Sequence, residues 1–294
     1  MGFRLANVGG RAALVHDERY FDVATVSDGG LSSDPMLAIE YPNELTALAA
    51  KLGTKTPTGS LTDVELGAPV PRPQKSFGIG LNYIDHAAEG SMELPKNPLV
   101  FTKFPSCLVG PVADVEMRSD FCDYEGELVV VIGRGGKDIP AEQAWDHVVG
   151  VMVGQDISDR KAQFAAAPPH FDLGKSFDTF GPTGPVLVSL DEIGDPTNLR
   201  VVTEVNGEGR QNEAVASMVF DVPTLISYLS QITTLVTGDL IFTGTPAGVG
   251  APQGKFLVDG DVITTTIDGI GKLTNRCVRV SNHRSPGDRA GGAS

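Results

Sequence analysis

The sequence DYEGELVVVIG, at residues 123–133, changes from acidic to apolar within a few positions. The branched apolar half predicts a buried strand that ends at the glycine. Side chains two positions apart on a strand point to the same face, so Glu125 and Glu127 project together at the sheet edge, and Asp123 can lie beside them. Like charges beside a dry core are costly unless a cation or a shared proton relieves them. The stretch therefore indicates either a cation site or a solvated acidic strand end.

A second apolar strand, VVGVMVGQD at residues 148–156, also ends in a carboxylate, Asp156. This side chain can cap the turn that follows it, or it can act as a third oxygen ligand. Three carboxylates from two strand ends suit a hard cation, Mg²⁺ or Mn²⁺, whereas zinc more often recruits His or Cys.

Composition excludes several classes of protein. The chain has 294 residues and a formal net charge of −14, which argues against nucleic acid or an anionic membrane as partner. Its three cysteines are far apart and form no disulfide framework, so we expect a reducing, cytoplasmic location. The start of the chain does not resemble a signal peptide, and no apolar run approaches the roughly 20 residues that a membrane helix needs.

The chain is expected to divide at about residue 70. In the first segment, residues 1–70, the alternating stretches FRLANV and RAALVH flank Gly9-Gly10 and predict a hairpin, and YFDVATV predicts a further strand. Residues 43–52 have helical spacing, with Asn43 as the expected cap, and residues 54–75 are interpreted as a linker. The second segment, 71–282, carries the chemistry, and 283–294 is expected to be a disordered tail.

A short predicted helix near residue 86 carries a histidine and a carboxylate. His86 and Glu89 stand three positions apart and therefore share a face, and a carboxylate orients and strengthens an imidazole that acts as a base. The alternative is a surface ion pair. Glycines on both sides make this element a candidate mobile lid.

Two lysines and one threonine lie in loops that could face a ligand. Lys175 stands between glycine and serine, so its ammonium group can approach a ligand closely. Thr245 follows a strand and opens a glycine-rich loop that can offer N–H groups to a carboxylate. Lys103 also follows a strand, and the sequence alone favours an exposed lysine over a ligand contact.

Six segments in order resemble the fumarylacetoacetate hydrolase family, in particular its smaller, acylpyruvase-like members. These segments are GLNYIDHAAE, FTKFPS, DYEGELVVVIG, GQDISDR, KSFDTFGPTGP and GDLIFTGTPAGVG. The resemblance implies an α+β, mainly β fold, a mixed β-sandwich or roll with a small N-terminal domain, and a homodimer. It covers about residues 75–280 and so omits the first segment.

The resemblance also implies roles for individual residues. It assigns Glu125, Glu127 and Asp156 as metal ligands for Mg²⁺ or Mn²⁺, and His86 with Glu89 as the catalytic dyad. Lys175 would bind substrate and take part in catalysis. The remaining expected substrate contacts are Tyr83, Lys103, Gln163 and Thr245.

This sequence departs from the family pattern close to the expected pocket. Gln155 stands where many relatives have Asn, and Lys161 follows Arg160 where many have Arg-Asp. The segment AAAPPHFDLG, between Gln163 and Lys175, is particular to this chain. These departures put the identity of the substrate in doubt.

The leading hypothesis is a metal-dependent hydrolase that cleaves a carbon–carbon bond in a 1,3-dicarbonyl 2-oxo acid such as an acylpyruvate or fumarylpyruvate. His86, oriented by Glu89, would activate water, and Lys175 would add positive charge beside the enolate. The alternative is an oxaloacetate or 2-oxo acid decarboxylase, tautomerase or hydratase that uses the same chelate. A binding protein without turnover is the remaining hypothesis. Under each of these hypotheses the protein binds a small anionic 2-oxo acid or diketone.

Overall fold

The computed structural model describes residues 2–90 and 93–280 and is mainly β, as expected from the sequence. Its strands are β1 Arg4–Val8, β2 Arg11–His16, β3 Arg19–Asp22, β4 Gly59–Ser60, β5 Leu66–Gly67, β6 Ser76–Gly80, β7 Leu99–Thr102, β8 Leu108–Val109, β9 Val115–Met117, β10 Cys122–Asp123, β11 Gly126–Ile132, β12 Val148–Gln155, β13 Ser158–Asp159, β14 Gly181–Val188, β15 Arg200–Val205, β16 Glu208–Ala214, β17 Leu240–Phe242, β18 Val262–Ile267 and β19 Gly271–Arg279.

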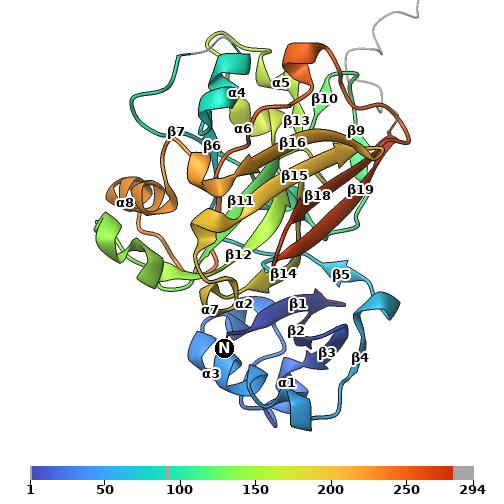
Figure 1. The fold of residues 1–294 in the computed structure, drawn as a ribbon, viewed down its shortest axis with the longest axis vertical. Helices are drawn as coiled ribbons and strands as arrows, with labels where there is room; N and C mark the ends of the chain where they lie inside the picture. Colours follow the sequence, from blue (N-terminus) through green and yellow to red (C-terminus); the bar gives the residue numbers. More distant parts are fainter. Residues whose placement is uncertain (1, 91–92, 281–294) are drawn as a thin grey trace, which may run out of the picture.

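The α-helices are short and lie around these strands (Figure 1). They are α1 Val23–Val26, α2 Pro35–Ala38, α3 Pro42–Ala49, α4 Ile84–Glu89, α5 Arg160–Gln163, α6 Phe171–Gly174, α7 Leu190–Ile193 and α8 Val222–Ile232. Short segments of 3-10 helix occupy Leu52–Thr54, Leu61–Asp63, Pro105–Cys107, Ala141–His147, Pro196–Asn198, Val215–Ser217 and Ala251–Gln253. Among the described residues, no helix has the length and apolar character needed to span a membrane.

Two sheets form the body of the molecule. The larger sheet follows the order β4-β3-β2-β1-β14-β12-β11-β17-β6-β7, and the second follows β16-β15-β18-β19-β9. Alternate residues of β11 face different cores. Leu128 and Val130 pack with Val201 of β15 in the first core, whereas Val129 and Val131 join the core that contains Leu5 of β1. Burial on both faces explains why this strand is continuously apolar.

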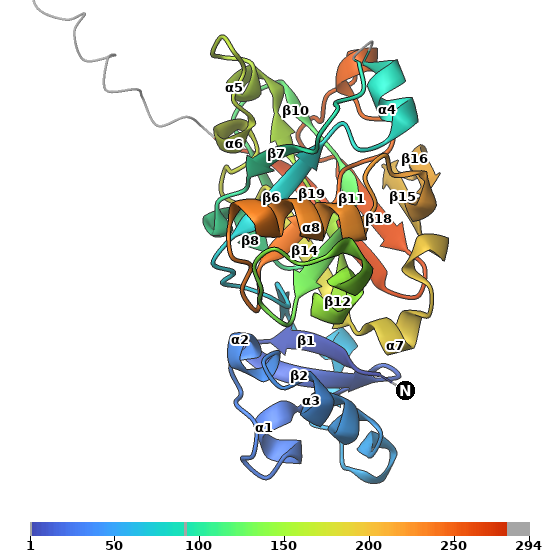
Figure 2. The same cartoon turned by 90° about the vertical axis from the view of Figure 1, so that its left-hand side faces the viewer.

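The N-terminal segment continues the larger sheet, because β1 pairs antiparallel with β14, with Leu5 opposite Leu187. Figures 1 and 2 show this segment at one end of the molecule and α4, α5 and α6 at the other. Residues 54–75, interpreted from the sequence as a linker, contain β4 and β5, which pair with β3 and β1. The boundary near residue 70 stays a prediction, and the expected tail at 283–294 lies outside the described residues.

Several local predictions are confirmed and others are wrong. The Asn-Gly pair at residues 206–207 predicts a type I′ hairpin from the sequence, and it joins β15 to β16 with positive φ at both residues. The strand expected at YFDVATV ends at Asp22, because the Asp22 side chain accepts the Thr25 N–H at 2.9 Å and starts helix α1. The helix expected at 43–52 is α3, whose N-cap is Tyr41 rather than Asn43. The sequence AEQAWDHV at residues 141–148 predicts a helix, and the structure has a 3-10 helix there over Ala141–His147.

Helix α8 covers one face of the larger sheet (Figure 2). The sequence predicts that Asp221-Val-Pro-Thr starts a helix, and the Asp221 side chain caps α8 by accepting the Thr224 N–H at 2.9 Å. Leu225, Ile226 and Leu229 of this helix pack into the same core as Leu128. The apolar side of α8 thus supports the strand that carries the acidic residues.

Candidate active site

The strands β11 and β12 bring three carboxylates together. They pair antiparallel with Gly126 opposite Gln155, which places Glu125 and Glu127 near Asp156 at the end of β12. One carboxylate oxygen from each lies within 4.8 Å of the others, and all three side chains are buried. This acidic triad, Glu125, Glu127 and Asp156, is a donor set suited to a divalent cation, and burial rules out a solvated strand end.

Gly126 separates the two glutamates and is closely surrounded. A methyl group built on it would lie 2.2 Å from Thr203 Oγ1 and 3.0 Å from Thr265 Cγ2. The Gly126 N–H donates to Gln211 Oε1 at 2.9 Å, and its carbonyl accepts from Thr245 Oγ1 at 2.9 Å. The backbone between the ligands is therefore fixed on both sides.

The two glutamates of the triad have opposite electrostatic environments. Burial, followed by repulsion from Asp156 and Glu125, raises the pKa of Glu127 well above its usual value. Burial also disfavours charge on Glu125, but Lys175 and Arg160 outweigh it and lower the Glu125 pKa to about 2. Glu127 is thus the position where an added positive charge would relieve the most repulsion.

Two buried lysines neutralise the rest of the triad. Lys175 Nζ lies 2.6 Å from Glu125 Oε2 and 2.7 Å from Asp156 Oδ2. Lys103 Nζ donates to Asp156 Oδ1 at 2.7 Å and to the Phe180 carbonyl at 3.1 Å. Lys103 is fully buried, so the exposed lysine favoured by the sequence is wrong. Because Asp156 binds two ammonium groups through its side chain, it does not cap the following turn; Asp159 does.

Arg160 has no role predicted from the sequence, although the structure places it at the site. Its guanidinium contacts Asp123 Oδ2 at 2.8 Å, Glu125 Oε1 at 2.7 Å and Gln163 Oε1 at 3.0 Å. Asp123 also accepts the N–H groups of Gly250 and Ala251, at 2.7 and 2.9 Å, and therefore lies outside the triad. The available signal was a basic residue directly after Asp159, in the same short buried segment as Asp156.

His86 and Glu89 share a face of α4, as predicted, and His86 is buried rather than on the surface. His86 Nδ1 lies 3.9 Å from Glu89 Oε2, beyond hydrogen-bonding distance, and has no hydrogen-bond partner among the described residues. Glu89 Oε2 instead accepts the Gly248 N–H at 2.8 Å. Burial lowers the pKa of His86, so the imidazole is neutral near pH 7.

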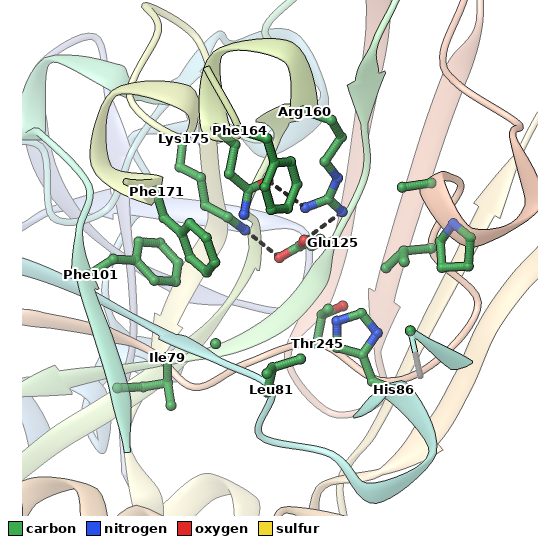
Figure 3. A pocket seen from close by; sticks show the side chains of 16 residues that line it. Ile79, Leu81, His86, Phe101, Glu125, Arg160, Phe164, Phe171, Lys175 and Thr245 are labelled. Carbon is green, nitrogen blue, oxygen red and sulfur yellow. Dashed lines mark hydrogen bonds and ion pairs between the residues drawn. The ribbon is translucent and has the colours of Figure 1, made fainter. Parts of the chain in front are cut away.

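A cavity of about 140 Å³ lies beside the triad (Figure 3). Its polar lining includes Glu125, Arg160, Lys175 and His86, and the expected contacts Gln163 and Thr245 also line it. Lys103 and Tyr83 are not part of this lining. Lys103 lies behind Asp156, and Tyr83 lines a separate depression with Asp85 and Glu213, so neither faces the cavity as a substrate contact.

Residues 75–278 match the family model for fumarylacetoacetate (FAA) hydrolase, C-terminal. The chain is 41% identical over 238 residues to the oxaloacetate tautomerase FAHD2A, mitochondrial, of Bos taurus, covering 80% of this chain and 76% of that protein. It is 47% identical over 225 residues to the oxaloacetate tautomerase YisK of Bacillus subtilis, covering 74% of each chain.

Solved structures agree in fold over nearly the whole chain. A crystal structure from Mycobacterium smegmatis, named as an HpcE protein, is 42% identical with a TM-score of 0.88, covering 95% of this chain and 100% of that one. Maleylpyruvate hydrolase from Sphingobium sp. SYK-6, solved with manganese(II) and pyruvate, is 28% identical with a TM-score of 0.80, covering 95% and 100%.

The chain therefore belongs to the fumarylacetoacetate hydrolase family, which confirms the resemblance and the expected fold. It is an enzyme of that family, and its curated relatives are named for a reaction of a 2-oxo acid. These relatives support the tautomerase alternative better than hydrolysis of a carbon–carbon bond.

Proposed function

We propose that this enzyme interconverts the enol and keto forms of a small 2-oxo acid, with oxaloacetate as the first substrate to test. The observation that carries the proposal is the arrangement of the dyad. Tautomerisation needs one group that moves a proton, and His86 presents a buried, neutral imidazole at the cavity. Activation of water by a His–Glu dyad needs a hydrogen bond that the 3.9 Å separation does not provide. The names of the tautomerase relatives support the same choice.

Glu125, Glu127 and Asp156 would hold the Mg²⁺ or Mn²⁺ that this chemistry calls for. The donor set fits because burial and mutual repulsion disfavour three adjacent carboxylate charges without a cation. When bound, the cation supplies a Lewis acid that stabilises negative charge on a neighbouring oxygen.

The residues of the chain account for the proton transfer. Conversion of the enol to the keto form removes a proton from the enol oxygen and adds one to C3, so no co-reactant is consumed. His86 moves this proton, because its lowered pKa keeps the imidazole in the form that can accept one. Lys175 places positive charge at the cavity and stabilises the anion between the two steps.

Hydrolysis of an acylpyruvate is the second candidate. The maleylpyruvate hydrolase, similar over 95% of this chain, favours it, and both members of the expected dyad are present. For this reaction Glu89 would have to leave the Gly248 N–H or His86 would have to turn toward Glu89. Tautomerisation uses the observed contacts without such a change.

The test is a set of incubations with the enol of oxaloacetate, acetylpyruvate and fumarylpyruvate. Metal-stripped protein receives Mg²⁺, Mn²⁺ or EDTA, and loss of the enol is followed by ultraviolet absorbance while NMR detects pyruvate and a carbon dioxide assay detects decarboxylation. We expect metal-dependent loss of the enol without release of carbon dioxide. Release of pyruvate from the diketones without acceleration of the enol reaction would replace the proposal by hydrolysis.

A further inference from the structure

Three phenylalanines form one side of the cavity. Phe101 of β7, Phe164 after α5 and Phe171 of α6 line it together, and we call this set the aromatic wall. Phe171 is the central ring, with centroids 5.9 Å from Phe101 and 6.1 Å from Phe164, both in edge-on contact. Figure 3 shows Phe101 and Phe171 on the side of Lys175 away from His86, and Phe164 between Lys175 and Arg160.

Hydrogen bonds fix the segment that carries the wall. Asp172 Oδ1 accepts the Thr102 N–H at 2.5 Å, and Ser176 Oγ accepts the Phe104 N–H at 2.9 Å. These contacts tie α6 to β7 and hold the Phe171 and Phe101 rings in contact. Phe164 remains 56% exposed at the rim, so the wall reaches from the cavity to solvent.

The cations that line the cavity are already paired with carboxylates. Arg160 contacts Asp123 and Glu125, and Lys175 contacts Glu125 and Asp156, all within 2.8 Å. Lys175 Nζ also lies 4.9 Å from the centre of the Phe101 ring. A carboxylate placed against the aromatic wall would therefore lose water without gaining an unpaired cation.

We propose that the aromatic wall selects 2-oxo acids whose C3 carries an apolar group, above all an aryl ring. The proposal rests on the proposed function and names the class of substrate for that site. With the 2-oxo acid end at the acidic triad, the C3 substituent lies against the three rings. A planar ring there makes edge-on or offset contacts of the kind that Phe171 already makes with its neighbours.

Binding can be measured without turnover by using oxamate and N-phenyloxamate, which share the 2-oxo acid end and cannot tautomerise at carbon. Isothermal titration calorimetry of the Mn²⁺-loaded enzyme is expected to show about tenfold tighter binding of the phenyl compound. Phe171→Ala should abolish this preference and leave oxamate unchanged. Phe171→Leu should keep part of it, which separates lost contact from a disturbed fold. Phe121→Ala is the matched control, because Phe121 is a half-exposed ring that pairs with Phe256 away from the cavity.

Turnover gives the second readout. The wild-type enzyme should have a higher kcat/KM for the enol of phenylpyruvate than for that of oxaloacetate, and Phe164→Ala or Phe171→Ala should lower the first value selectively. Equal binding of the two oxamates, or equal losses on both enols in these variants, would overturn the role of the wall while the tautomerase function stands. Failure to bind oxamate and to accelerate either enol would overturn both.

Discussion

The acidic triad and helix α4 face the same cavity but are held in different ways. Each carboxylate of the triad is buried and hydrogen-bonded, to Lys103, Lys175, Arg160 or the Gly244 N–H. On α4, the His86 Nδ1 atom has no hydrogen-bond partner among the described residues, and Glu89 contacts the loop at Gly248. The acidic triad is thus held in place in a form suited to a cation, whereas α4 leaves the His86 Nδ1 atom available for reaction.

The difference shows where stability and reactivity are separated in this enzyme. Buried charges in the triad region compensate one another, so a change there should affect folding and metal binding together. His86 supports no hydrogen bond of its own side chain among the described residues, so a change there should affect chemistry alone. Four predictions test this separation.

Lys103→Met should have the largest effect on stability. It removes a fully buried ammonium and leaves Asp156 with less compensation, at a cost of about 3–5 kcal/mol in the free energy of unfolding. Urea unfolding of metal-free protein measures this, with exposed Lys51→Met as the control. A loss equal to that of the control would mean that the buried charges are not coupled.

Glu127→Gln should change metal affinity and folding stability together, in opposite directions. We expect Mn²⁺ affinity to fall more than about 100-fold by calorimetry, because one of three carboxylate ligands loses its charge. Burial and repulsion raise the pKa of Glu127 in the folded state. At any pH above 4.5, its usual pKa, ionisation of Glu127 therefore lowers the stability of the folded protein. The metal-free variant should therefore be more stable than wild type at pH 7, and the gain should disappear below pH 4.5. Exposed Glu65→Gln should change neither quantity.

His86→Ala should lower kcat for the enol about 100-fold, because it removes the group that moves the proton. Mn²⁺ affinity and the free energy of unfolding should stay close to wild type, in contrast to the triad variants. A wild-type rate in His86→Ala would refute the assigned role, and a loss of Mn²⁺ binding would refute the separation between the two halves.

The pH profile should show the smallest effect. Protonation inactivates His86, and burial lowers its pKa below 6.5, so kcat/KM should stay constant as pH falls to 6.5 and decline only below it. The Glu89 charge raises this pKa, so Glu89→Gln should move the decline to still lower pH, whereas exposed Asp85→Asn should leave it nearly unchanged. A shift to higher pH in Glu89→Gln would contradict the electrostatic role of Glu89.

Local spacing made the triad predictable from the sequence. Glu125 and Glu127 are two residues apart at a strand end, and Asp156 ends the next long apolar strand, so pairing of neighbouring strands was enough to bring them together. The Asn206-Gly207 hairpin and the Asp221 cap are equally local. Each of these features depends on short stretches of chain.

The features that could not be predicted from the sequence depend on contacts between distant parts of the chain. Lys103 is buried because the loops at Lys175 and Phe180 close over it, more than 70 residues away. Arg160 directly follows β13, and its contacts with Asp123 and Glu125 depend on the pairing of β13 with the distant strand β10. The aromatic wall likewise joins Phe101 to Phe171 across the chain, and no periodicity records that contact.

The crowded Gly126 has a practical consequence for protein engineering. A methyl group at this position would lie 2.2 Å from Thr203 Oγ1, on a strand of the second sheet, so even alanine would force the Thr203 side chain to shift. Mutant libraries aimed at new substrates can therefore diversify Phe164 and Phe171 of the aromatic wall, whereas codon 126 should be left out of randomisation. The useful variation in this scaffold lies in the aromatic wall rather than in the backbone that joins the two glutamates.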